Sequence, residues 1–247
     1  GSIIREVSLM LDGKNVLAIV PARSGSKGIP NKNMRKVLGI SLIGRAGLCL
    51  SELNWLDGKI ISTDSKDYAE EGKRYGLDAP FLRPENLSTD TSNTYDGVVY
   101  ALNEAEKFYN KRFDVVILAE PISPLRKPED LEGATKKLIA SHADSVVTVC
   151  HLNSKCHPAK ALSINDDKRL VFYEERGAKV VNRQSLEPLY WRNGVCYVIN
   201  RESLLENSWF FTDNTLPFII DREIVNIDHP IELEWAEFLL KKHSLTK

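Results

Sequence analysis

The sequence lacks the long apolar runs and the one-sided charge that indicate a membrane protein or a nucleic-acid-binding protein. No apolar run approaches the ~20 residues of a membrane span. The 33 basic and 34 acidic residues among 247 nearly cancel. This balance argues against a nucleic acid or a membrane as the main partner, so any affinity for phosphate must be local. A chain of this length buries about three-quarters of its unfolded surface and needs no disulfide or metal for stability.

Paired cysteines and histidine motifs are also missing. The four cysteines are scattered and none has CxxC spacing. With no recognisable signal peptide ahead of them, we expect reduced thiols in a cytoplasmic protein. The five histidines form no HxH or HExxH pattern and predict no catalytic role. We find no internal repeat and no low-complexity tract, and the length fits one domain, with or without a substantial insertion.

Short apolar runs alternate with helical periodicities over about the first 130 residues after the amino terminus. This alternation predicts an α/β fold with a parallel, doubly wound sheet. Ser41 stands where it can cap the first helix. Strands are predicted at 16–20, 59–62, 114–119 and 145–150, and helices at 42–53, about 66–75, 96–109 and 128–140.

The alternation breaks at residues 151–190, which are polar, contain proline and include only one predicted strand, at 169–173. We interpret this stretch as an insertion or arm. Beyond it, the pattern predicts strands at 195–200, 218–220 and 224–225 and a short helix at 201–205. A closing helix at 230–242 is predicted to turn four apolar side chains inward: Ile231, Trp235, Phe238 and Leu239.

The loop at residues 21–33 follows the first predicted strand and concentrates hydrogen-bond donors. Arg23, Lys27 and Lys32 are interleaved with Gly25 and Gly28. Glycines let the backbone approach a ligand, and such donors after a strand suit a polyphosphate. The spacing matches neither GxxxxGK[ST] nor GxGxxG. Ordinary solvated lysines would explain one cation but not the set, so we interpret the loop as a phosphate site.

Three other stretches leave alternatives open. Residues 83–92 form a polar loop in which Asp90 or Ser92 either caps the next helix or contributes to binding a base or ribose. Arg126 follows a buried strand in the run 120–126 and is either structural or substrate-binding. Asp228 is either a helix N-cap or a ligand of Mg²⁺, which is often held by one or two carboxylates plus phosphate oxygens.

Together these motifs resemble the acylneuraminate (CMP-sialic acid) cytidylyltransferases. The first motif, Pro21–Asn33, is highly specific, and the resemblance covers about residues 15–242. Matching stretches continue through Ser62–Asp64, Leu82–Pro84, Leu87–Thr91, Glu120–Arg126, His157–Lys160, Asn193–Gly194 and Ile227–Asp228.

The resemblance implies a Rossmann-like, three-layer domain over residues 15–242 with a mostly parallel sheet. It also implies CTP and a nonulosonic acid as substrates, Mg²⁺ and a homodimer in which residues 151–190 reach toward the partner's active site. Carried over by position, Lys32 and Arg23 are catalytic. The implied nucleotide-binding residues are Ala22, Arg23, Ser26, Lys27, Asn33, Arg83 and Thr89. The implied sugar-binding residues are Glu120, Lys160, Arg183, Tyr197, Phe210 and Phe211, and the implied metal ligands are Asp228 and Asn226.

Two positions depart from the family pattern. Asn226 stands where an aspartate of the metal motif is usual, and Glu120 stands where glutamine is common. A carboxylate at position 120 would repel the carboxylate of a sugar acid but could pair with an amine or bind hydroxyls. The resemblance implies a sialic-acid-type acceptor (neuraminate, legionaminate or a relative). Within that class Glu120 argues against plain N-acetylneuraminate and favours a diamino relative such as legionaminate, or a less usual nonulosonate or octulosonate. The alternatives are a 3-deoxy-octulosonate-type cytidylyltransferase and a catalytically impaired nucleotide-binding homologue.

Overall fold

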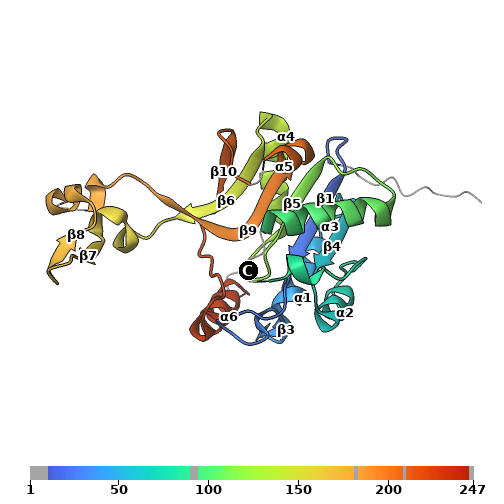
Figure 1. Ribbon diagram of the computed structural model, residues 1–247, viewed down its shortest axis with the longest axis horizontal. Helices are drawn as coiled ribbons and strands as arrows, with labels where there is room; N and C mark the ends of the chain where they lie inside the picture. Colours follow the sequence, from blue (N-terminus) through green and yellow to red (C-terminus); the bar gives the residue numbers. More distant parts are fainter. Residues whose placement is uncertain (1–10, 90–93, 181–182, 208–209, 245–247) are drawn as a thin grey trace, which may run out of the picture.

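A six-stranded sheet forms the centre of the molecule (Figure 1). The computed structural model describes residues 11–89, 94–180, 183–207 and 210–244. The strand order is β10-β6-β9-β5-β1-β4, and every neighbouring pair is parallel except those made by β9. The strands are β1 (Val16–Pro21), β4 (Gly58–Ser62), β5 (Val115–Leu118), β6 (Ser145–His151), β9 (Tyr190–Asn200) and β10 (Thr215–Ile219). The predicted mostly parallel α/β fold is confirmed, with β9 as an antiparallel insertion.

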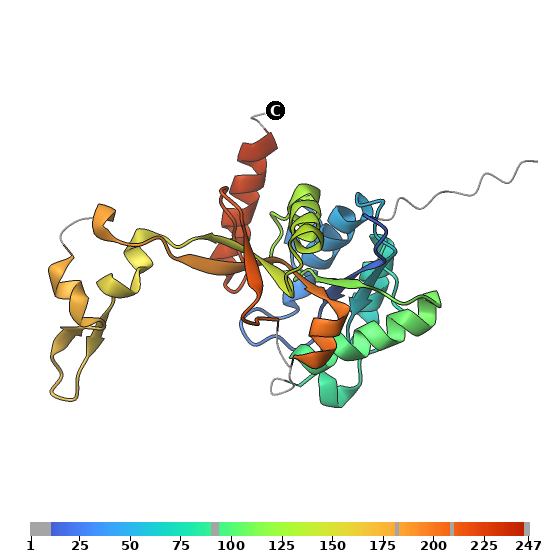
Figure 2. The ribbon, with the colours of Figure 1, turned by 90° about the horizontal axis from the view of Figure 1, so that it is seen from above.

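Helices cover both faces of the sheet and give three layers (Figures 1 and 2). One face of β1 packs in a core cluster with residues of α1, α4 and α6, and the other face packs with residues of α3 and α5. Val16 to Val20 have no exposed surface, as expected for a strand covered on both sides. The helices are α1 (Leu42–Ser51), α2 (Lys66–Arg74), α3 (Thr94–Tyr109), α4 (Pro128–Ser141), α5 (Arg201–Glu206) and α6 (Pro230–Ser244).

Local sequence signals place several of these boundaries. The Ser41 hydroxyl accepts a hydrogen bond from the Gly44 N–H at 2.9 Å, which confirms Ser41 as the cap of α1. Gly76, with φ +89°, follows the end of α2, where a left-handed residue commonly stops a helix. Pro128 occupies the first turn of α4, where its missing N–H costs nothing.

Residues 152–189 form an arm that projects from the body (Figure 2). It leaves at the end of β6 and returns at the start of β9. The arm contains an antiparallel hairpin of β7 (Leu162–Ile164) and β8 (Leu170–Phe172), of which only the second strand was predicted. Alternation is too short in β7 to distinguish it from a loop. The Arg176 guanidinium bridges Glu174 and Glu187, which ties the segment after β8 to the end of the arm that leads into β9.

Two sequence predictions are wrong. Ile224 and Val225 are buried but lie outside any strand, because apolar content alone does not show whether a segment has a pairing partner. In α6, Leu239 is buried, but Ile231, Trp235 and Phe238 are 46–66% exposed. This helix has two apolar stripes and packs through the one containing Leu233, Ala236 and Leu239.

No helix in the described ranges is long and apolar enough to cross a membrane.

Candidate active site

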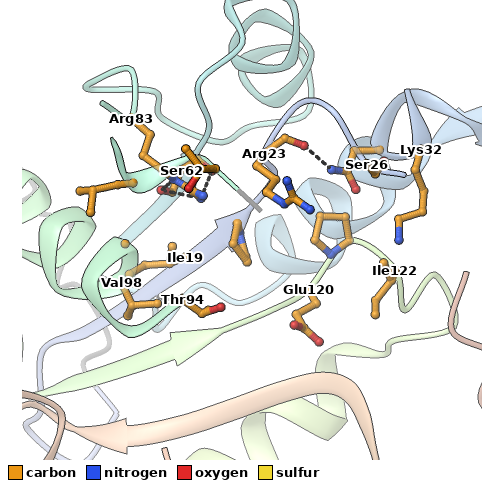
Figure 3. Close-up of a pocket in the computed structure, with 16 residues that line it drawn as sticks. Ile19, Arg23, Ser26, Lys32, Ser62, Arg83, Thr94, Val98, Glu120 and Ile122 are labelled. Atoms are coloured by element: carbon orange, nitrogen blue, oxygen red, sulfur yellow. Dashed lines mark hydrogen bonds between the residues drawn. The ribbon is translucent and has the colours of Figure 1, made fainter. Parts of the chain in front are cut away.

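A cavity of about 350 Å³ lies at the carboxyl edge of β1, β4 and β5 (Figure 3). Parallel strands end together at this edge, as is general for ligand sites in α/β sheets. The cavity wall is formed by the loops after β1 and β5, by the end of β4 and by the segment between α2 and α3. β9 runs the other way, so its beginning, at Arg192–Gly194, lies at the same edge. The lining residues are Ile19, Pro21, Arg23, Ser26, Lys32, Asn33, Ser62, Arg83, Leu87, Thr89, Thr94, Gly97, Val98, Glu120, Pro121 and Ile122.

The structure brings together seven of the residues implied by the family resemblance. Arg23, Ser26, Lys32 and Asn33 come from the first loop, Arg83 and Thr89 from the segment between α2 and α3, and Glu120 follows β5. Ala22 is buried behind the cavity, where its N–H bonds the Ser62 carbonyl at 2.9 Å. Lys27 is exposed on the same loop, outside the cavity lining.

Internal hydrogen bonds hold the first loop in shape. The Ser24 N–H and Oγ both donate to the Asp64 carboxylate, each at 2.7 Å. Burial would raise the pKa of Asp64, but the two bonds from Ser24 hold it below its usual value. Gly25 has φ +76°, a left-handed conformation that glycine adopts without strain. The Asn33 side chain donates to the Arg23 carbonyl at 3.4 Å. The loop therefore presents its donors in a preformed arrangement.

Two arginines raise the positive potential of the cavity. Arg83 donates to the Ser62 carbonyl at 2.8 Å and to the Ser62 hydroxyl, which fixes its guanidinium at the end of β4. Burial lowers the pKa of Arg83, the charge of Arg23 lowers it further, and Asp64 opposes both. An arginine remains charged despite such a shift. The cavity therefore favours an anionic ligand.

Asp228 approaches the first loop from the other side. Its Oδ1 lies 3.4 Å from the Lys32 Nζ. A Cβ at Gly28 would lie 2.9 Å from the Asp228 carbonyl, so this glycine allows the close approach. The Glu232 carboxylate accepts bonds from the Asp228 and His229 N–H groups and thus serves the start of α6. Within the described chain, the Asp228 carboxylate is not used as an N-cap and has Lys32 as its polar partner.

Asn226 is occupied by an internal contact. Its Oδ1 lies 3.0 Å from the Ser123 Oγ, which also lies 2.8 Å from the Asn193 carbonyl. The one Asn226 atom that could bind a cation is therefore engaged with a hydroxyl. Among the described residues, no cluster of three or more His, Cys, Asp or Glu side chains could hold a metal ion. Asp228 alone fits a Mg²⁺ ion that takes its remaining ligands from phosphate and water.

Arg126 is structural. It is buried and donates to the carbonyls of Val195 at 2.6 Å, Glu120 at 2.5 Å and Gly194 at 3.1 Å. These bonds join the loop after β5 to the irregular start of β9. The alternative that Arg126 binds substrate is disfavoured, because its guanidinium is turned into the protein.

The three aromatic residues implied to bind the sugar lie on β9 (Tyr197) and in the segment after α5 (Phe210 and Phe211). Tyr197 and Phe210 are buried with ring centroids 5.5 Å apart, and Phe210 belongs to the core cluster under β9. Burial, and then the charge of Glu120, raise the pKa of Tyr197 to about 12. Phe211 is exposed under the guanidinium of Arg192, 5.6 Å from the ring centroid. None of these three rings lines the cavity described above.

Lys160 and Arg183 belong to the arm, and Lys160 is not part of the cavity lining. Lys160 is exposed. The side chain of Arg183 is outside the described part of the chain, as are Asp90 and Ser92, the two candidate caps of α3. Three features escaped the sequence reasoning: the Ser24–Asp64 pair, the Arg126 contacts and the room that Gly194 leaves for Glu120. The Asn193-Gly194 pair, directly before the apolar run at 195–199, is the sequence signal for the last.

Known proteins resemble this chain over most of its length. A family profile described as Cytidylyltransferase matches residues 17–225. The CMP-N,N'-diacetyllegionaminic acid synthase of Legionella pneumophila is 33% identical over 234 residues, 92% of this chain and 96% of that protein. The N-acylneuraminate cytidylyltransferase of Streptococcus agalactiae is 33% identical over 210 residues, 84% of this chain and 48% of that protein.

The fold also matches a solved structure, that of CMP:2-keto-3-deoxy-manno-octonic acid synthetase complexed with CTP. The TM-score is 0.70 at 14% sequence identity, over 93% of this chain and 100% of the other. At that identity the match concerns the fold alone, and it confirms the predicted architecture. The profile match and the identity to the Legionella pneumophila protein agree with the motifs at residues 21–33 and 120–126. The chain belongs to the cytidylyltransferase family.

Proposed function

We propose that this enzyme transfers CMP from CTP to the anomeric hydroxyl of a sialic-acid-type nonulosonic acid and releases pyrophosphate. The observation that carries this proposal is the convergence of Arg23, Lys32 and Arg83 on one cavity that Glu120 also lines. The activities named for the two sequence relatives support it, because both act on nonulosonic acids. The octulosonate enzyme is similar in fold only, at 14% identity.

The cationic loop binds the triphosphate in this proposal. Arg23 and Lys32 lie where they can neutralise the charge that develops as pyrophosphate leaves the α-phosphorus, with Ser26, Lys27 and Asn33 as further donors. Because the loop is already held by Asp64, little reorganisation is needed when the nucleotide binds. Arg83 and Thr89 lie across the cavity from Lys32 and suit the base and ribose. The sugar hydroxyl then attacks in line, and positioning supplies most of the catalysis.

Asp228 is the protein ligand that we propose for a divalent cation, Mg²⁺. The cation would neutralise triphosphate oxygens and lower the pKa of the attacking hydroxyl. Asp228 suits this role because its carboxylate is 59% exposed and its polar partner in the described chain is a cation, Lys32. A bound metal would take over the carboxylate and free the Lys32 ammonium for the phosphates. Asn226 instead holds the loop of Ser123 in place.

We infer one cytidylyltransferase domain over residues 15–242, with the arm as a dimerisation insertion. Apolar side chains are exposed along the β7–β8 hairpin, where Ile164, Leu170 and Tyr173 are each more than 65% exposed. Such a cluster is typical of a surface that another chain covers. The arm starts and ends at the edge of the sheet that carries the cavity. A partner's arm could thus supply Lys160 and Arg183 to the sugar carboxylate. The four free cysteines support a cytoplasmic location.

The test is pyrophosphate release with CTP, UTP, GTP or ATP against a set of nonulosonic and octulosonic acids, with Mg²⁺ present. We expect turnover with CTP and a nonulosonic acid. Preference for the octulosonic acid would select the octulosonate-type alternative. A rise in Tm with CTP but no product from any acceptor would identify a catalytically impaired homologue and contradict the proposal.

A further inference from the structure

The Glu120 carboxylate is a charged group whose own hydrogen bonds are missing from the described structure. Glu120 lies two residues beyond the end of β5 and lines the cavity with Lys32 (Figure 3). Its backbone carbonyl accepts a bond from Arg126, but no described residue donates a hydrogen bond to its carboxylate oxygens. A poorly solvated carboxylate without donors is costly in a folded protein and so indicates a function.

Three neighbouring cations favour the ionised form of Glu120, but in the described structure none of them donates a hydrogen bond to its carboxylate. Burial raises the pKa of Glu120, while the cations of Arg126, Arg192 and Lys32 lower it, and Asp228 adds a smaller opposing effect. Arg126 is committed to three carbonyls, and Arg192 lies over Phe211. The cations therefore offset only part of the effect of burial, the pKa stays above its usual value, and the carboxylate oxygens remain available to a ligand.

The backbone opposite Glu120 is shaped to make room for it. Between β6 and β9 the pairing runs from Val149↔Arg192 to Val147↔Tyr197, so β9 bulges between these two residues. Gly194 lies in the bulge with φ +66°, and a Cβ there would lie 2.6 Å from the Glu120 Oε2. Such bulges often re-aim side chains next to active sites. Arg126 holds both walls of this space, since it bonds the carbonyls of Glu120 and Gly194.

We propose that Glu120 determines which acceptor the enzyme takes, by accepting hydrogen bonds from an N–H or O–H donor of the sugar acid. This inference rests on the proposed function. A carboxylate accepts but cannot donate, so it selects an acylamino, amino or hydroxyl group. It also repels the carboxylate of the sugar, which must therefore bind elsewhere, near the cations. The acceptor class is a nonulosonic acid that places a donor group, rather than its own carboxylate, against the bulge.

The test compares Glu120→Gln with the wild-type enzyme, using Glu234→Gln on an exposed turn of α6 as the matched control. Glutamine keeps the size but removes the charge. We expect the KM for the acceptor to rise roughly tenfold to a hundredfold, the effect of losing a hydrogen bond to a charged group. The KM for CTP should stay within twofold. Because the carboxylate has no internal hydrogen bond to lose and its burial is costly, Tm should not fall. Glu120→Asp, which keeps the charge but shortens the side chain, should raise the acceptor KM by less.

Three acceptors locate the contact: a diacylamino nonulosonic acid, a monoacylamino one and a fully hydroxylated one. If the acceptor KM of Glu120→Gln rises only for the diacylamino acid, the partner of Glu120 is the second acylamino group. If it rises for both acylamino acids, the partner is the acylamino group that they share. An equal rise for all three acids identifies a hydroxyl. Each result supports the inference. If the wild type makes a CMP-sugar but Glu120→Gln changes no acceptor KM by more than twofold, the inference is wrong. If the wild type makes no CMP-sugar, the proposed function itself fails.

Discussion

Two sides of one cavity are built in different ways. The loop side is one continuous segment, residues 21–33, whose shape is fixed by Asp64 and by bonds within the loop itself. The bulge side combines Glu120 with Gly194 and Val195 of β9, which Arg126 joins across sequence separations of 68 and 69 residues. A local segment can be rigid before a ligand arrives, whereas the bulge side depends on the whole sheet. We therefore expect substitutions on the two sides to affect different substrates.

The largest effect is expected for Lys32→Ala on the loop side. Loss of one group that stabilises charge in the transition state lowers kcat roughly 10²–10³-fold. Lys36→Ala, an exposed lysine on β2 (Lys36–Val37), is the control and should leave kcat unchanged. Steady-state pyrophosphate release gives both values. A kcat within threefold of wild type for Lys32→Ala would remove Lys32 from the catalytic set.

Arg126→Met removes the guanidinium that joins the segments of the bulge side. It leaves three buried carbonyls without a donor, and we expect the free energy of unfolding to fall by about 3 kcal/mol. Urea denaturation measures this loss. At temperatures where the variant remains folded, the KM for the acceptor should rise more than the KM for CTP. Equal changes in both KM values would mean that Arg126 supports the whole cavity and not one side.

Leu170→Asp on the β8 strand tests whether the bulge side is completed by another copy of the chain. A buried charge in the dimer contact should shift the protein to the monomer, which light scattering coupled to size exclusion detects. The KM for the acceptor should then rise about tenfold, the effect of losing a charge-assisted contact, with CTP binding little changed. Asp166→Ala, on the exposed turn of the same hairpin, is the control. A wild-type monomer with full activity would contradict the role of the arm.

Asp64→Asn should give the smallest effect and confine it to the loop side. The amide keeps the side chain but weakens the bonds from Ser24, so the KM for CTP should rise about fivefold to tenfold. Hydrogen bonds from Ser24 hold the pKa of the folded-state carboxyl below its usual value. Its contribution to stability is therefore present above the unfolded-state pKa and is lost as the pH falls through the folded-state pKa. Acidification should destabilise the wild type more than the variant, as followed by circular dichroism. An acceptor KM that rises as much as the CTP KM would contradict the assignment of the loop side to CTP and of the bulge side to the acceptor.

Sequence reasoning identified the loop side because its residues are adjacent in the chain. The cations, glycines and preceding strand at residues 16–33 all fall within one window. On the bulge side it singled out Glu120 through the family resemblance but not the roles of Arg126 and Gly194, because these residues acquire their roles only when β5 and β9 pair antiparallel. For the same reason it misplaced the exposed face of α6. Periodicity marks Trp235 and Phe238 as apolar but does not say whether the sheet or another surface meets them.

The most direct test of the account is the product itself. CTP carrying a labelled α-phosphate is incubated with the enzyme, Mg²⁺ and a diacylamino or monoacylamino nonulosonic acid, and the products are separated by mass spectrometry. The account predicts that the label appears in a CMP-sugar, with one pyrophosphate released for each sugar consumed. Label that remains in CTP, or appears only in free CMP, with every nonulosonic acid would contradict it.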